Sequence, residues 1–163
     1  MTMPKRLAKY LKKHHIQYDV IDHVPAYTSL ETASAGHVIP GSMAKVVMVK
    51  ADERDVMLVL PSDHTVDWLK LSALLETRDV RCEKEAEFSP IFPDVEAGAM
   101  PPFGSLYAIP CYIDHTLFKG DWVTFCAGNH RQCLRVWTDD FARITKAKRG
   151  DFAVAGAPLL AEV

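Results

Sequence analysis

The first hydrophobic pattern along the chain is helical. Between residues 4 and 15, Leu7, Leu11 and His14 recur at a spacing of three or four positions, which places them on one face of an α-helix. Lysines occupy another face of the same segment, and Pro4 suits a first helical turn. We therefore predict an amphipathic helix over residues 4–15.

Three further helices are predicted from residues that commonly cap helix ends. Thr28 is followed three positions later by a glutamate, the pattern of a capping box, and Gly36 suits the end of the same helix. Asp67 predicts the start of another helix, in which Trp68 and the leucines that follow it face inward. Thr138 is expected to cap a last short helix.

Apolar runs that lie between turn residues predict seven strands. They cover residues 18–24, 44–50, 56–61, 80–82, 106–113, 122–127 and 132–137. A polar turn joins the second and third of these into a hairpin, and the last three are expected to run antiparallel. Because helices and strands are intermixed without a regular βαβ order, the predicted fold class is α+β, with a mixed, largely antiparallel sheet and packed helices.

Length and charge narrow the class of protein. The 163 residues suit one domain, and no repeat or linker divides them, so residues 1–163 are predicted to form a single domain. The tail over residues 150–163 is rich in alanine and glycine and is expected to be loosely ordered. A net charge of −2 excludes a histone-like polycation. With neither a secretory signal nor a run of about 18 apolar residues, we expect a cytoplasmic protein without a membrane partner.

Three features are candidates for chemistry, and each has a plain structural alternative. Lys45 is a lone cation in an apolar strand and lies either at the exposed start of that strand or in a site. Residues 98–104 belong to the proline- and glycine-rich stretch 89–104, which is either a ligand-binding loop with close backbone approach or a surface connection. The turn over residues 128–130 is either part of a site or simple hairpin geometry.

Other catalytic patterns are missing from the sequence. The seven histidines form no HxH, HExxH or Cys/His cluster, and the chain contains no GxSxG elbow, P-loop or GxGxxG. We therefore expect no metal and no cofactor. Basic residues gather at both ends of the chain, either as a footprint for a phosphate backbone or as solvated faces. They are Lys5, Arg6, Lys9, Lys12 and Lys13 at one end, and Arg143, Lys146, Lys148 and Arg149 at the other.

Five segments carry a family resemblance when they are taken in order. They are HVPAYT (23–28), AKVVMVK (44–50), GAMPPFG (98–104), YIDHTL (112–117) and AGNHRQCLRV (127–136). Their order and spacing resemble the YbaK/prolyl-tRNA synthetase-associated family of freestanding aminoacyl-tRNA deacylases, over about residues 5–145. This resemblance implies a twisted, barrel-like mixed sheet flanked by helices. It also implies hydrolysis of amino acids wrongly attached to tRNA, classically proline tRNA carrying alanine or cysteine.

The resemblance also implies roles for individual residues. Lys45 matches the lysine that holds the 3′-terminal nucleotide, and the loop from Gly98 to Pro102 matches the one that helps to hold the aminoacyl carbonyl. His130 matches a histidine near the amino-acid side chain. The other residues expected to bind substrate lie in the same motifs and are Thr28, Phe103, Gly104, Asp114, Gly128 and Asn129. The implied partners are the acceptor end of mischarged tRNA and an aminoacyl-tRNA synthetase.

The sequence departs from the family pattern at one position, and its residues suggest a mechanism for ester hydrolysis. Val46 stands where family members acting on alanine tend to carry asparagine directly after the lysine, which weakens the case for alanine without touching the chemistry. An aminoacyl ester is already activated, so its hydrolysis needs positioning and oxyanion donors more than a strong nucleophile. The ribose 2′-OH of the substrate can orient the attacking water. The alternatives are a catalytically silent tRNA- or nucleotide-binding module and a hydrolase of another small ester.

Overall fold

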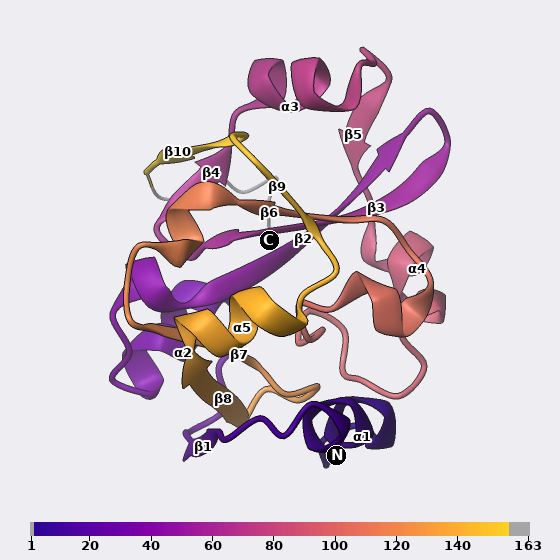
Figure 1. Cartoon of the computed structure of the whole chain (residues 1–163). Helices are drawn as coiled ribbons and strands as arrows, with labels where there is room; N and C mark the ends of the chain where they lie inside the picture. The colour runs from indigo at the N-terminus through magenta and orange to yellow at the C-terminus, as the bar shows by residue number, and fades with distance from the viewer. Residues whose placement is uncertain (1, 157–163) are drawn as a thin grey trace.

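The computed structural model describes residues 2–156, in which helices and strands are intermixed as the α+β prediction requires (Figure 1). The α-helices are α1 (Lys5–Lys13), α2 (Ser29–Ala35), α3 (Trp68–Leu75), α4 (Glu85–Phe88) and α5 (Thr138–Ile144). The strands are β1 (Asp19–Asp22), β2 (Ala44–Ala51), β3 (Arg54–Pro61), β4 (His64–Val66), β5 (Val80–Cys82), β6 (Cys111–Asp114), β7 (Trp122–Cys126), β8 (Gln132–Trp137), β9 (Lys148–Gly150) and β10 (Ala153–Ala155). None of the helices in this part of the chain is long and apolar enough to cross a bilayer.

The strands form a five-stranded sheet, a three-stranded sheet and a two-stranded ribbon. The largest has the order β5-β2-β3-β6-β9, in which β5, β2 and β3 are antiparallel while β6 and β9 run parallel to β3. The second has the antiparallel order β1-β8-β7, and the ribbon pairs β4 with β10. An isolated bridge between Met43 and Thr124 joins the two larger sheets. The sheet is therefore mixed and mostly antiparallel, as expected, but it is divided into separate ladders.

The β2–β3 hairpin is the centre of the fold because both of its faces are buried. Asp52 and Glu53 adopt positive φ angles of 49° and 64° at its tip, the conformation of a tight two-residue turn. Met48 and Met57 are paired and belong to a core with α1, α5, β7 and β8. The neighbouring pair Val49 and Val56 faces a second core with α3. Burial on both faces explains why these strands are almost continuously apolar.

The strand predicted over residues 106–113 was wrong in its first half and in its direction. A 3₁₀ turn covers Gly104–Tyr107, and β6 begins only at Cys111. Ala108 has a φ of 56° and Pro110 has no N–H, so neither suits a regular ladder. The chain folds back so tightly that a Cβ on Gly104 would lie 2.8 Å from that of Cys111. The strand then pairs parallel with β3 instead of antiparallel with β7.

Of the three predicted helix caps, two are confirmed and one is wrong, and the short helix α4 was not predicted. The Thr28 hydroxyl accepts a hydrogen bond from a backbone N–H of α2, and the Asp67 carboxylate accepts two from α3. Thr138 does not cap α5, because its hydroxyl donates to the Gly120 carbonyl at 2.6 Å and so ties the helix to the preceding turn. Trp68 was expected to face inward but is 36% exposed at the start of α3.

The described part of the expected loose tail is packed into the fold. Residues 153–155 form β10 against β4, and the Phe152 side chain is completely buried in the second core. The Ala/Gly-rich composition therefore gave a wrong prediction for residues 150–156. Residues 157–163 of the predicted tail lie outside the described residues.

Candidate functional site

A cavity of about 500 Å³ lies along one edge of β2. Strand β5 pairs with β2 only over residues 49–51, whereas residues 44–48 line the cavity. The remaining walls come from the N-terminal half of α2, the segment between β5 and α4, residues 97–100 and the end of β7. A volume of this size suits a small-molecule group.

Lys45 is buried in the wall of this cavity and not at an exposed strand start. Its side chain is 8% exposed, although both of its neighbours in β2 are apolar. Among the described residues that line the cavity, it is the only lysine or arginine. An ammonium group in the wall of a cavity can form charge-assisted hydrogen bonds with an anion that enters, so this position suits the recognition of an anionic group.

The loop after Val95 reaches the cavity only through its first residues. Gly98, which lines the cavity, has a φ of 86°, a conformation that other residues rarely adopt. Its N–H lies 3.2 Å from the Met100 sulfur, which is a weak acceptor. A Cβ at this position would lie 3.5 Å from the His130 ring, so a longer side chain would crowd the space between loop and histidine.

His130 joins two walls of the cavity. Its Nδ1 lies 3.1 Å from the Ala26 carbonyl oxygen and its Nε2 lies 2.8 Å from that of Ala97. The ring also packs against Tyr27, with the ring centroids 4.7 Å apart. The histidine therefore holds the segment before α2 and the glycine loop on either side of the opening.

The turn at Gly128, two positions before His130, is hydrogen-bonded to the glycine loop. Gly128, at a φ of 94°, donates its N–H to the Ala99 carbonyl at 3.0 Å and accepts from the Glu96 N–H at 2.8 Å. The Asn129 side chain is buried and accepts from the Arg131 N–H at 2.9 Å. Gly128 and Asn129 thus shape the turn and do not line the cavity themselves.

Glu83 also lines the cavity, and the sequence pattern gave no sign of it. The residue is 8% exposed, and neither carboxylate oxygen has a hydrogen-bond partner within residues 2–156. Burial, and then the neighbouring Asp55, raise the pKa of Glu83 to about 7. In the sequence it is one of several glutamates between residues 83 and 87. Only its pairing position beside β2 distinguishes it from the others.

Comparison with known proteins identifies the family of this chain. The family model for the aminoacyl-tRNA editing domain matches residues 23–144, which include every residue named above as lining the cavity. The chain belongs to the family of aminoacyl-tRNA editing domains. None of the curated proteins matches the sequence.

Solved structures share the fold of this editing domain at low sequence identity. A hypothetical protein superposes with a TM-score of 0.81 at 18% identity, over 92% of this chain and 100% of the other. A proposed trans-editing enzyme for prolyl-tRNA synthetase superposes with a TM-score of 0.76 at 20% identity, over 93% of this chain and 96% of the other. At these identities the likeness establishes the fold alone.

The structure of the editing domain brings together only part of the predicted site. Thr28, Lys45, Gly98 and His130 line one cavity. The predicted residues outside it are Pro102, Phe103, Gly104, Asp114, Gly128 and Asn129. Phe103 lies instead in the aromatic core, against Phe125 and Phe141.

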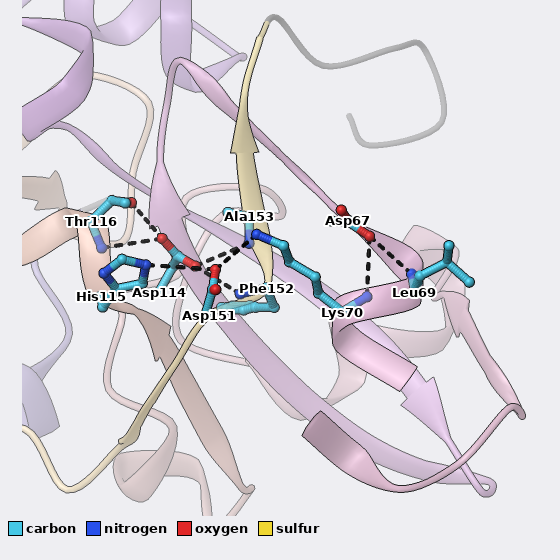
Figure 2. Close-up of polar contacts among 9 residues, drawn as sticks. All are labelled: Asp67, Leu69, Lys70, Asp114, His115, Thr116, Asp151, Phe152 and Ala153. Atoms are coloured by element: carbon cyan, nitrogen blue, oxygen red, sulfur yellow. Dashed lines mark hydrogen bonds and ion pairs between the residues drawn. The ribbon is translucent and has the colours of Figure 1, made fainter. Parts of the chain in front are cut away.

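Asp114 is the predicted substrate-binding residue that the structure places most differently. Its buried carboxylate accepts hydrogen bonds from the N–H groups of Phe152 at 2.9 Å and Ala153 at 3.0 Å, and from both the N–H and the hydroxyl of Thr116 (Figure 2). These donors occupy both oxygens. Asp114 therefore fastens β6 to the C-terminal segment and leaves no oxygen for a substrate.

A cluster beside Asp114 has the spacing of a metal site. Possible ligand atoms of Asp114, His115 and Asp151 lie within 4.8 Å of one another. However, the Lys70 ammonium lies 3.2 Å from the Asp151 carboxylate, and backbone donors hold Asp114 (Figure 2). A cation would have to displace these partners, so the arrangement suits a structural ion pair better.

Replacement of Asp114 is expected to destabilise the fold. In Asp114→Ala, the N–H groups of Phe152 and Ala153 lose their acceptor inside the protein, and we expect a loss of about 3 kcal/mol in the free energy of unfolding. Urea denaturation measures this change. The control is Asp151→Asn at an exposed position of the same cluster, for which a loss below about 1 kcal/mol is expected. Equal losses in both variants would contradict the anchoring role.

Proposed function

We propose that this editing domain is a freestanding deacylase that hydrolyses the ester bond of mischarged aminoacyl-tRNA. The observation that carries the proposal is the meeting of Lys45, Gly98 and His130 at one cavity, because these residues lie in three separate motifs of the sequence. The cavity can take the aminoacylated end of a tRNA but not its stem, so the reacting group enters while the duplex stays outside.

Each of these residues has a role in the proposed reaction. Lys45 holds the terminal phosphate or ribose as a point charge. Backbone N–H groups around Gly98 bind the ester carbonyl and stabilise the negative charge that develops on it. The substrate 2′-OH orients a water molecule, whose oxygen bonds to the acyl carbon as the ester C–O bond breaks and a proton passes to the leaving 3′-oxygen.

The thiols near the site do not require a different mechanism. Burial raises the pKa of the Cys111 thiol to about 11, which keeps it protonated. Cys126 lines the cavity, and it lies directly opposite Cys133 in the β7–β8 ladder. An activated ester attacked by an oriented water needs neither thiol.

Selection among amino acids is expected to come from the apolar part of the wall. Val46, Met48 and Met100 belong to the apolar lining of the cavity, and in the proposed complex they contact the amino-acid side chain. A narrow pocket excludes larger cognate residues sterically, which is the second sieve of editing. Because valine follows Lys45 in this chain, the preferred amino acid is left for experiment to identify.

A panel of mischarged tRNAs tests the proposed function directly. Purified protein is incubated with radiolabelled tRNAs that carry correct or incorrect small amino acids, with proline tRNA included. We expect rapid release of the amino acid from at least one mischarged tRNA, while proline tRNA that carries proline stays intact. Binding of every species without release would support a silent binding module instead. Hydrolysis of a simple amino-acid ethyl ester at the same rate would support a general esterase.

The proposed substrate also suggests a partner and a place in the cell. One protein with the same fold is described as a proposed trans-editing enzyme for prolyl-tRNA synthetase, which supports proposing that synthetase as the source of the mischarged tRNA. Aminoacyl-tRNA is used by ribosomes in the cytoplasm, so the proposed activity belongs there.

Binding of the tRNA is expected to depend on salt through the lysines of α1. Lys5, Lys9 and Lys12 are exposed, whereas Arg6 is held by Asp94 at 2.7 Å and Arg143 by Asp140 at 3.2 Å. Replacing the three lysines by glutamine should therefore reduce the slope of log K against log salt by about 2 to 3.

Filter binding across a salt series measures that slope. The single variant Lys119→Gln, at an exposed turn, serves as a charge control and should change the slope by less than about 1. An unchanged slope in the triple variant would place the footprint elsewhere, with the basic residues from Lys146 to Arg149 as the next candidates.

A further inference from the structure

Glu83 is a buried carboxylate for which residues 2–156 provide no hydrogen-bond donor. It lies between β5 and α4 and lines the cavity. Only 8% of the residue is exposed, and neither oxygen has a hydrogen-bond partner within residues 2–156. A buried carboxylate is costly without a partner, so a group of this kind in a cavity wall indicates that a ligand supplies the missing donors.

The charged groups around Glu83 do not neutralise it. Its N–H donates to the Met48 carbonyl at 2.9 Å, which fixes the residue beside β2. On β2 and β3, the Lys50 ammonium is paired with the Asp55 carboxylate at 2.6 Å. On β5 and α4, Arg81 forms two hydrogen bonds of 2.8 Å with the carboxylate of Glu87. Lys50 and Arg81 therefore each already have an acidic partner, and neither is reserved for Glu83.

We infer that Glu83 binds the α-ammonium group of the aminoacyl ester; this inference rests on the proposed deacylase function. The cavity wall carries a cation, Lys45, and an anion, Glu83, and much of the rest of its lining is apolar. The aminoacylated end of tRNA has the complementary arrangement, an anionic phosphate at one end and a cationic amine at the other. No other lining group of the described residues is a buried anion.

The inference narrows the substrate class. Esters with a free α-amino group can donate to both oxygens of Glu83, whereas an N-acylated amino acid has neither the charge nor enough N–H groups to do so. Peptidyl-tRNA and formylated aminoacyl-tRNA would leave the carboxylate buried and unpaired. The site therefore selects against growing peptide chains as well as against large side chains.

The test uses Glu83→Gln, which removes the charge and keeps the size of the side chain. The matched control is Glu76→Gln at the end of α3, a helix of which no residue lines the cavity. Each protein is titrated calorimetrically with 3′-alanylamino-3′-deoxyadenosine, a non-hydrolysable analogue, and with its N-acetyl form. The same proteins are assayed with a mischarged tRNA from the panel and its N-acetylated form.

The expected result is a loss of discrimination. Native protein should bind the free-amine analogue about 10- to 100-fold more tightly than the N-acetyl form, and Glu83→Gln should bind both equally weakly. In turnover, KM should rise in the variant while kcat changes little. Equal binding of both analogues by the native protein would overturn the inference. A fall in kcat at constant KM would also overturn it, because it would make Glu83 a general base.

The pH dependence gives an independent readout. Since the ionised form of Glu83 binds the ammonium group, affinity for the free-amine analogue should fall as pH drops below about 7. It should fall again as the amine loses its proton above about pH 8. The acid limb should disappear in Glu83→Gln. Lys50, Asp55, Arg81 and Glu87 are the charged groups that face Glu83 and are unchanged in this variant.

The same variants and analogues also test the folding of the protein separately from its function. Folding raises the pKa of Glu83 from 4.5 to about 7, so its ionisation costs stability as pH rises through that window. The thermal midpoint of Glu83→Gln should therefore equal or exceed that of native protein at pH 8. If no tRNA is hydrolysed but the analogues are still discriminated, the proposed function fails and the ammonium site stands. If tRNA is hydrolysed but the two analogues bind equally, the proposed function stands and only the role of Glu83 is overturned.

Discussion

Mischarged tRNA that ends in 2′-deoxyadenosine is expected to resist hydrolysis by the native protein. The deoxy substrate keeps the phosphate for Lys45 and the carbonyl for the loop at Gly98, but it lacks the hydroxyl that orients water in the proposed mechanism. Loss of a group that positions or transfers a proton in the transition state typically costs about 10²- to 10⁴-fold in rate. We therefore expect single-turnover rates close to the uncatalysed background.

A binding measurement makes this result interpretable. The deoxy substrate should compete with the ordinary one at a similar concentration, since most of its contacts remain. Rapid turnover of the deoxy substrate would mean that the protein supplies its own nucleophile or base. Cys126 is then the first residue to replace, because it lines the cavity, whereas Cys111 is buried elsewhere and His115 lies beside Asp151. Loss of that turnover in Cys126→Ala would replace substrate assistance with thiol catalysis.

Sequence patterns predicted the elements that are determined by residues close together in the sequence. The β2–β3 hairpin follows from two apolar runs around the polar turn at Asp52 and Glu53. The start of α2 follows from Thr28, whose hydroxyl accepts the expected hydrogen bond. Both depend on residues a few positions apart, which is the range over which turn and capping rules operate.

Long-range pairing explains where those patterns were insufficient. Phe152 stands in an Ala/Gly-rich segment, and its N–H finds an acceptor only in Asp114, which lies 38 positions earlier. Likewise, Glu83 is buried because its backbone pairs with Met48 on β2. Neither partner can be identified from the neighbouring residues, so composition suggested a loose tail in the first case and gave no sign of a buried carboxylate in the second.

The same reasoning explains why the predicted site was too large. A motif is continuous in sequence, but only some of its residues can face one cavity. In the loop after residue 97, Gly98 faces the cavity while Phe103 turns into the aromatic core. The resemblance to a family named continuous segments, and the structure separates the residues of those segments that line the cavity from those that lie outside it.

The second large effect is expected at Lys45. Lys45→Ala removes the only lysine or arginine among the described residues of the cavity wall and should slow deacylation by about a hundredfold, the value of one preorganised polar contact. Urea denaturation should show a change in the free energy of unfolding below about 1 kcal/mol, since β2 keeps its apolar residues and its pairing with β3. The control Lys70→Ala removes an exposed lysine paired with Asp151 and should leave the rate unchanged.

The conservative variant shows what kind of contact Lys45 makes. An ammonium group acts as a point charge without a fixed fork geometry, so Lys45→Arg should retain part of the activity if the cavity accommodates the larger guanidinium. Activity of Lys45→Ala should fall mainly through KM if the lysine holds the phosphate in the ground state, and through kcat if it aligns the ester for attack. A variant that is folded and fully active would contradict the anchoring role. The phosphate would then have to be held outside the cavity, and the exposed lysines of α1 would be the next candidates to bind it.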